Sequence, residues 1–243
     1  MNSSSIRSAP RLTVVSAAPV SHRDLSAWLD ETERGRLVRL RRAEDRDRFA
    51  TSRALLKDVV AAVAGVRPAA VRLGYTCARC GRPHGRPVVL GPAEVVDRHV
   101  SLSHAGDRVV VAVTTVGPVG VDVEPADAGS FAGFSDVALT DAEAGWVGQA
   151  PAPQRDRFRT AYWVRKESVL KATGQGLSIP ATAVEVTPPD QPAGVVAWHS
   201  SDAVPAQLWD IDVGRNYVGC VAVLSRTTPV LELTTDAAVR LKP

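Results

Sequence analysis

Two carboxylates, two residues apart, offer the clearest chemistry in the chain. Asp122 and Glu124 lie in VGVDVEP, residues 119–125, whose valines are typical of a strand. Since side chains alternate across a strand, both carboxylates share one face, while Val121 and Val123 point into a core. Two carboxylates on a buried face repel each other unless a cation joins them, and Mg²⁺ prefers such oxygens. The alternative is an edge strand with a wet polar face.

A third carboxylate lies in WVRKESVLKATGQGL, residues 163–177, on a predicted helix. Glu167 and Lys171 are four residues apart and therefore share a helix face, with Lys166 beside them. On an exposed helix such a pair contributes only about 0.3–0.5 kcal/mol. Beside a metal site, the same residues supply a third carboxylate ligand and two cations for a pyrophosphate.

A histidine follows a serine at the end of another predicted strand, in SLSHAGD, residues 101–107. A single histidine in such a place is more often structural than catalytic. However, the hydroxyl of Ser103, the ring of His104 and the amides of the following turn together suit an anion.

The elements that must position these residues follow from the apolar pattern and from the Gly and Pro residues that interrupt it. Gly214 and Asn216 mark a hairpin turn in the strand-like last third of the chain. We expect helices over residues 24–63, 140–149 and 154–173, clear strands over 11–18, 99–104, 108–115 and 119–125, and short extended pieces over 69–73 and 86–90.

One stretch of the sequence resembles another 109 residues later. RFATSRALLKDVVAAVAG, residues 48–65, aligns without a gap with RFRTAYWVRKESVLKATG, residues 157–174, and Asp58 falls opposite Glu167. Chance similarity between two amphipathic helices is the alternative to a true duplication. The duplication predicts an α+β fold of two pseudo-symmetric α/β halves, residues 1–116 and 117–243, with a site in the cleft between them.

These motifs resemble the surfactin-synthetase type of 4'-phosphopantetheinyl transferase. The resemblance rests on VGVDVEP, WVRKESVLKATGQGL and SLSHA, and the first two together are highly specific. RF…SRALL, residues 48–56, is similar to the family's N-terminal helix, and GRP, residues 85–87, to its Gly-basic-Pro loop. The resemblance covers residues 34–177 and implies two pseudo-symmetric halves with coenzyme A bound between them.

The resemblance also implies roles for individual residues. Asp122, Glu124 and Glu167 would ligate Mg²⁺ together with the pyrophosphate of coenzyme A, and Lys171 and Lys166 would contact the same phosphates. The remaining residues implied in coenzyme A binding are Arg53, Ser103 and His104 at the 3'-phosphate, Gly85, Arg86 and Pro87 along the adenine, and Arg36 and Arg39 as further phosphate contacts.

The implied reaction joins the phosphopantetheine of coenzyme A to a serine of an acyl or peptidyl carrier protein and releases 3',5'-ADP. Asp122, Glu167 and Lys171 are the expected catalytic residues, with Glu167 or a water on the metal as the base. Fatty-acid, polyketide and nonribosomal-peptide carriers all remain compatible. The family's partner contact maps to residues 126–150, where Phe131, Phe134 and Trp146 either meet the carrier or pack inside the second half.

Composition excludes several other classes of protein. The 243 residues are 45% apolar with a net charge of +3, and acidic residues lie among the N-terminal arginines, so we expect no nucleic-acid partner. The sequence has no apolar run long enough for a membrane span and no secretory signal, and its three cysteines favour a reducing cytoplasm. An internally duplicated chain needs no partner copy to form its site, so we expect a monomer.

Three alternatives stay open at this point. Cys77, Cys80 and His84 could bind zinc, but a structural zinc site requires four ligands and a second pair with suitable spacing is absent. Another Mg²⁺-dependent enzyme, such as a nucleotide phosphohydrolase, would share the carboxylates. A coenzyme A or nucleotide binding module without catalysis is the third, although the set of Asp122, Glu124, Glu167 and Lys171 is intact.

Overall fold

Two β-sheets form the centre of the molecule. The computed structural model describes residues 9–76, 81–82, 85–198, 205–240 and 242–243. The first sheet has the order β11 (Val230–Thr234), β1 (Arg11–Ala17), β5 (Arg108–Thr114) and β4 (His99–Ala105). The second has the order β6 (Val119–Pro125), β10 (Tyr217–Leu224) and β9 (Ala206–Ile211). Two small hairpins, β2 (Arg72–Gly74) with β3 (Val88–Gly91) and β7 (Val184–Val186) with β8 (Val195–Trp198), complete the strands of the described residues.

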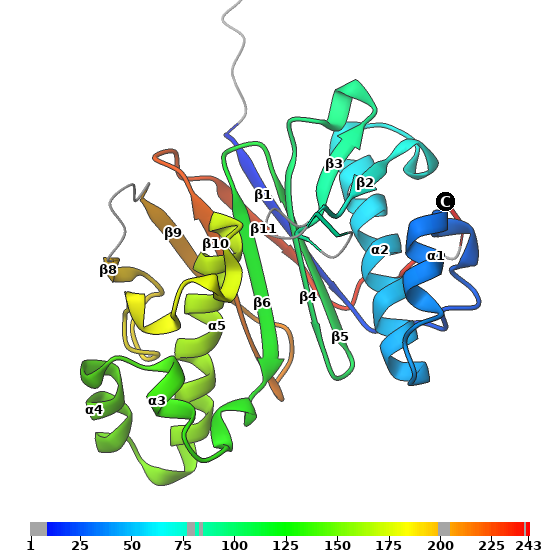
Figure 1. Ribbon diagram of the computed structural model, residues 1–243. Coiled ribbons are helices and arrows are strands. Elements are labelled where there is room, and N and C mark those ends of the chain that lie inside the picture. The colour runs from blue at the N-terminus through cyan, green and yellow to red at the C-terminus, as the bar shows by residue number, and fades with distance from the viewer. Residues whose placement is uncertain (1–8, 77–80, 83–84, 199–204, 241) are drawn as a thin grey trace, which may run out of the picture.

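One long helix covers each sheet. Figure 1 shows α2 (Ala43–Ala64) and α5 (Arg155–Thr173) on opposite sides of the molecule, with the sheets between them. The shorter helices are α1 (Glu31–Leu37), next to α2, and α3 (Phe134–Ala138) and α4 (Asp141–Gln149), next to α5. The predicted α+β class is therefore confirmed. No helix in the described part of the chain is both long and apolar enough to cross a membrane.

Period-2 alternation of valines explains why the sheets and helices stack in this way. Along β5, Val109, Val111 and Val113 pack in the cluster that includes α2, whereas Val110 and Ala112 pack in a second cluster with valines of β6 and β10. The two sheets thus share an apolar layer between them, and each has its own layer beneath its helix.

The two segments with similar sequences form corresponding helices. Both α2 and α5 end at a glycine in the left-handed region, Gly65 with φ of 69° and Gly174 with φ of 77°. These glycines are the last residues of the two aligned segments, and each closes its helix without the strain that a Cβ would bring. The final strand crosses the proposed halves, because β11 from the second half pairs in parallel with β1 of the first sheet.

The first predicted helix is wrong as a single element. Residues 24–63 contain a short 3₁₀ turn (Ser26–Trp28) and α1 before α2 begins at Ala43. A reciprocal capping box explains the interruption: Asp30 Oδ1 accepts from the backbone N–H of Glu33 at 2.8 Å, and Glu33 Oε2 accepts from that of Asp30 at 3.0 Å. Such a cap starts a new helix, and a 3.6-residue pattern alone does not reveal it.

Candidate active site

The edge strands of the two sheets lie beside each other and are joined through two serines. The backbone N–H of Val121 on β6 donates to Ser101 Oγ on β4 at 3.0 Å. Two residues further along β4 and one residue further along β6, Ser103 Oγ donates to Asp122 Oδ1 at 2.8 Å. The structure therefore brings Ser103 and Asp122 together across the boundary between the two sheets, as the sequence predicted for residues of one site.

Asp122 and Lys171 form the centre of this site. Asp122 is only 2% exposed, and its Oδ1 also accepts from Lys171 Nζ at 2.7 Å. The same ammonium donates to Ser103 Oγ at 3.1 Å and to the carbonyl of Val121 at 3.2 Å. The second oxygen of Asp122, Oδ2, is buried and has no hydrogen-bond partner among the described residues. One lysine therefore compensates only part of this buried carboxylate.

Glu124 and Glu167 add two further carboxylates to the same space. Burial, followed by repulsion from Asp122 and Glu167, raises the pKa of Glu124 to about 7. Burial also raises the pKa of Glu167 to about 7, to which Asp122 adds, against the opposing effect of Lys171. Glu167 Oε2 is buried without a partner among the described residues. The site therefore carries more negative charge than Lys171 balances.

The chemistry of these oxygens fits a hard divalent cation. Two buried carboxylate oxygens without partners, among three acids that influence one another's pKa, are the kind of donor that Mg²⁺ prefers. The set is not preassembled: among the described residues, no group of three or more His, Cys, Asp or Glu side chains is arranged to hold a metal ion. In this structure the ammonium of Lys171 lies against Asp122 instead.

Lys171 also lines a cationic cavity of about 460 Å³. Four of its lining side chains are cations, and none of the lining residues is acidic. Such a lining suits a ligand with several anionic groups. The residues that line this cavity are Arg36, Arg53, Gly85, Arg86, Pro87, Ser101, Leu102, Lys171, Gly174, Gln175 and Gly176.

The predicted phosphate-binding arginines occupy different positions relative to this cavity. Arg36 Nη1 and Arg53 Nε are both buried without hydrogen-bond partners in the described structure. Arg86 Nη1 donates to the carbonyl of Ala172 at 3.0 Å, which fixes the loop of the first half against the end of α5. Arg39 requires a correction, because it lies beyond the end of α1, is exposed and does not line the cavity.

His104 follows Ser103 on β4 and is not among the residues that line the cavity. Its imidazole is exposed, yet the surrounding protein and then the cation of Arg53 lower its pKa to about 4. Since an exposed ring keeps much of its hydration, the cations Arg53, Arg48 and Lys171 matter more here than burial does. His104 is therefore neutral at pH 7 and can donate a hydrogen bond to an anion.

Lys166 contradicts the sequence prediction. It is fully buried, forms an ion pair with Glu143 Oε2 at 2.5 Å and donates to the carbonyl of Ala138 at 2.8 Å. A neighbour in sequence lies about 100° around a helix, so the position next to Glu167 directs Lys166 beneath α3 and α4 and away from the carboxylates. The role that we predicted for Lys166 at the phosphates is wrong.

Lys166→Ala is therefore expected to affect stability and to spare ligand binding. Glu143 would stay buried without its cation, which typically costs about 3–5 kcal/mol of the free energy of unfolding. Denaturant unfolding would measure this loss, and calorimetry on the folded fraction would show unchanged affinity for coenzyme A. A large loss of affinity with unchanged stability would return Lys166 to the site.

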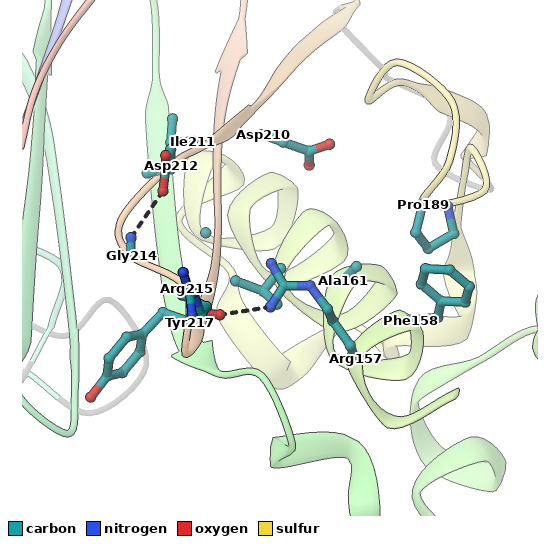
Figure 2. A pocket seen from close by; sticks show the side chains of 12 residues that line it. Arg157, Phe158, Ala161, Pro189, Asp210, Ile211, Asp212, Gly214, Arg215 and Tyr217 are labelled. Carbon is teal, nitrogen blue, oxygen red and sulfur yellow. Dashed lines mark hydrogen bonds between the residues drawn. The ribbon is translucent and has the colours of Figure 1, made fainter. Parts of the chain in front are cut away.

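A second cavity, of about 400 Å³, lies between α5 and the β9–β10 hairpin and contains none of the predicted residues. Figure 2 shows that its polar groups largely satisfy one another: Arg157 Nη1 donates to the carbonyl of Arg215 at 3.1 Å, and the N–H of Gly214 donates to Asp212 Oδ1 at 3.0 Å. Asp210 is paired with Arg165. The polar groups of this cavity therefore lack hydrogen-bond partners less often than those of the cationic cavity do.

Some residues of the site were missing from the sequence prediction. Ser101 was detectable in principle, because it lies two residues before Ser103 and therefore on the same face of β4. Gln175 lines the cavity only because α5 ends at Gly174, and no sequence signal marks it. Cys77, Cys80 and His84, the candidate zinc ligands, lie outside the described residues.

Comparison with known proteins agrees with this geometry. Residues 118–222, which include the three carboxylates and Lys171, match the family model described as the 4'-phosphopantetheinyl transferase superfamily. The chain is 29% identical over 166 residues to a 4'-phosphopantetheinyl transferase of Bacillus subtilis, covering 67% of each chain. It is 26% identical over 186 residues to 4'-phosphopantetheinyl transferase HetI of Nostoc sp., covering 75% of this chain and 76% of the relative. The family resemblance drawn from the motifs is confirmed, and the family is one of transferase enzymes.

Proposed function

We propose that this chain is a member of the 4'-phosphopantetheinyl transferase superfamily, whose model it matches, and that it transfers phosphopantetheine from coenzyme A to a serine of an acyl or peptidyl carrier protein. The observation that supports this most is the junction at Lys171. Lys171 lines a cavity with four cations and no acid, and its ammonium also pairs with Asp122, one of three carboxylates that influence one another. Such a junction suits a ligand whose phosphates lie next to a divalent cation.

The cationic cavity would bind the nucleotide end of coenzyme A. We assign the 3'-phosphate to Arg36 and Arg53, whose buried nitrogens lack partners in the described structure, with His104 as a further contact. Gly85, Arg86 and Pro87 would lie along the adenine. Guanidinium groups match phosphate oxygens in geometry as well as in charge, which favours a phosphorylated ribose over a plain one.

Asp122, Glu124 and Glu167 would hold Mg²⁺, which when bound would neutralise charge on the pyrophosphate. Lys171 would then exchange its contact with Asp122 for a phosphate oxygen. Because Lys171 pairs with Asp122 and also lines the cavity, a change of its side-chain rotamer would make this exchange. The hydroxyl group of Ser103 on β4 would keep Asp122 oriented during this exchange.

In the proposed reaction, the carrier serine oxygen bonds to the β-phosphorus of coenzyme A, and the bond from that phosphorus to the bridging oxygen breaks. The released group is 3',5'-ADP, and Lys171 would stabilise the negative charge that develops on it. The serine proton must leave as the new bond forms, and Glu167 Oε2, which lacks a partner within the described residues, is an acceptor inside the site.

We further propose that residues 1–116 and 117–243 are the two halves that enclose the ligand, and that the protein acts as a monomer. Both walls of the site come from one chain, since Ser103 and Arg53 lie in the first half and Asp122 and Lys171 in the second. A reaction that uses coenzyme A and carrier proteins of fatty-acid, polyketide or nonribosomal-peptide synthesis also favours the cytoplasm.

The carrier would dock near the loop and helix after β6. Phe131 is 58% exposed there and makes an edge-on contact with Phe134, their ring centroids 5.3 Å apart. Phe134 is buried, and Trp146 packs against Phe158 in the second half. Of the three aromatic residues named from the sequence, Phe131 therefore remains a candidate for the partner surface, and the other two serve the core.

Phe131→Ala is expected to raise KM for the carrier about tenfold, the effect of losing an interface contact worth about 1.4 kcal/mol. Because the ring is exposed, stability should change by less than about 0.5 kcal/mol. Phe134→Ala is the matched control, since it should lower stability by about 3–5 kcal/mol and leave KM of the folded protein unchanged. A normal carrier KM in Phe131→Ala would move the docking surface elsewhere.

The test of the function itself is the mass of an apo carrier protein after incubation with this protein, Mg²⁺ and coenzyme A. We expect a gain of one phosphopantetheine group, which EDTA abolishes and readdition of Mg²⁺ restores. Turnover of coenzyme A without any carrier would favour a phosphohydrolase instead. Binding of coenzyme A without transfer to any of several carrier types would favour a binding module.

A further inference from the structure

Two aromatic rings hold the pair of arginines in the cationic cavity. The guanidinium carbon of Arg53 lies 4.0 Å from the ring centroid of Phe49 and 5.3 Å from that of Tyr75. That of Arg36 lies 5.3 Å and 5.6 Å from the same two centroids. Phe49 and Tyr75, here called the aromatic clamp, are both buried. Each cation thus contacts both ring systems, the arrangement that cation–π attraction favours.

Tyr75 is the most strongly anchored member of the clamp. Its hydroxyl donates to Glu33 Oε1 at 2.7 Å, and its carbonyl accepts from the N–H of Gly85 at 2.5 Å. The first bond ties the ring to α1, which carries Arg36, and the second ties its backbone to the Gly85–Arg86–Pro87 loop. One residue therefore connects the two arginines with the opposite wall of the cavity.

A buried ion pair with Lys57 holds Glu33, the partner of the Tyr75 hydroxyl, in place. Glu33 is fully buried, and its Oε2 accepts from Lys57 Nζ at 2.7 Å and from the N–H of Asp30 at 3.0 Å. Lys57 also donates to the carbonyl of Trp28 at 2.6 Å. Every oxygen of Glu33 is thereby satisfied, so the carboxylate cannot swing toward the arginines and neutralise them.

We infer that Tyr75 is a positioning residue. Together with Phe49, and through Glu33 and Lys57, it holds Arg36 and Arg53 side by side before a ligand binds. As a result, the cavity distinguishes a ribose with a 3'-phosphate from a ribose without one. This inference rests on the proposed function for the identity of the ligand. It goes beyond that function, because none of the four supporting residues is among those that line the cavity.

Arg36 and Arg53 repel each other, and this repulsion is why they need other residues to hold them together. Burial lowers the pKa of Arg53, and the charge of Arg36 lowers it further, against the opposing effects of Tyr75 and Glu33. Without the rings, both long side chains would turn outward into solvent, and binding would have to restrict them again at the cost of their conformational freedom. The clamp keeps the cations together before the phosphate arrives.

The test compares binding of 3',5'-ADP and 5'-AMP by calorimetry, since these probes differ only in the 3'-phosphate. For the wild-type protein we expect a preference for 3',5'-ADP of about 100-fold or more, the value of several charge-assisted hydrogen bonds. Tyr75→Leu and Phe49→Leu should each reduce that preference at least tenfold and leave the affinity for 5'-AMP unchanged. Tyr75→Phe, which keeps the ring and loses only the bond to Glu33, should fall between wild type and Tyr75→Leu.

Val184→Ala serves as the control for destabilisation, because Val184 is buried in the second half and distant from the clamp. A merely structural role for Tyr75 would reduce the binding-competent fraction for both probes alike, as Val184→Ala would. An undiminished preference in folded Tyr75→Leu would overturn the inference and leave the proposed function intact. If neither probe bound the wild-type protein, the result would contradict the proposed function itself.

Discussion

Replacing Glu167 with glutamine is expected to reduce phosphopantetheine transfer by about 10²–10⁴-fold while coenzyme A still binds. The substitution keeps the shape of the side chain and removes one of three carboxylates in the site. The cationic cavity, which would supply most of the affinity for the nucleotide, has none of the three carboxylates in its lining and stays intact. The measurement is a single-turnover assay of an apo carrier protein, with calorimetry for coenzyme A.

Glu167→Gln should preserve or raise the stability of the metal-free protein, although it lowers the activity. Since burial raises the pKa of Glu167 from 4.5 to about 7, the folded protein binds more protons than the unfolded chain between these values. In the absence of metal, ionisation of Glu167 therefore lowers the stability as the pH rises from 4.5 through 7. Glu167→Gln cannot ionise, so at pH 7 and above the metal-free variant should be at least as stable as the wild type. Thermal unfolding at pH 5 and pH 8 would measure this.

Glu44→Gln is the matched control, because Glu44 is exposed on α2 and undergoes the same change of charge. We expect normal transfer and unchanged pH dependence of stability in that variant. Normal turnover in Glu167→Gln would remove Glu167 from the chemistry. Loss of turnover together with a loss of stability would indicate a structural role instead.

The strands and their alternation were predictable because burial imposes a period of two on short, valine-rich segments. Asp122 and Glu124 share a face, and Val121 and Val123 lie in the core between the sheets, as the sequence of β6 indicated. The sequence analysis placed Asp122 and Lys171 in one site, but it assigned them to a metal and to phosphates, and their direct ion pair is seen only in the structure.

The errors have a common physical origin, which is that direction around a helix matters more than proximity in sequence. Lys166 is adjacent to Glu167 but lies beneath α3 and α4, where Glu143 provides its counter-charge. That partner is 23 residues away, and no local pattern identifies it. Arg36 and Arg39 were similarly treated as equivalent, but only Arg36 faces the clamp, since the chain leaves α1 before Arg39.

The aromatic clamp also could not be predicted from local patterns in the sequence. Phe49 and Tyr75 come from a helix and from the residue after β2, and their rings contact the same arginines only in the folded protein. Neither residue has a reactive group that would mark it as part of a site. Sequence reasoning finds the groups that bind and react, whereas the groups that orient them are recognised by their contacts.

Gly120→Ala is the second substitution with a large expected effect, although its residue has no side chain. A Cβ at this position would lie 2.0 Å from the carbonyl oxygen of Ser168, 2.5 Å from the backbone nitrogen of Ala172 and 2.9 Å from Lys171 Cβ. These are mainly backbone atoms of α5, so the helix cannot yield by a change of rotamer. We expect a loss of about 3 kcal/mol or more in the free energy of unfolding, at or above the usual range for overpacking.

The same clash should also inactivate the molecules that still fold. To admit the methyl group, α5 must move away from β6, and this movement carries Glu167 and Lys171 away from Asp122. A displacement of about 1 Å can cost about 10²-fold in rate, so transfer should fall by at least that factor per folded molecule.

Gly145→Ala on α4 is the matched control, because a Cβ there meets no atom within 4 Å, and alanine in a helix should stabilise the protein by about 0.5–1 kcal/mol. Normal transfer by folded Gly120→Ala would mean that the distance between β6 and α5 does not set the geometry of the site. The proposed roles of Glu167 and Lys171 beside Asp122 would then lose their structural basis.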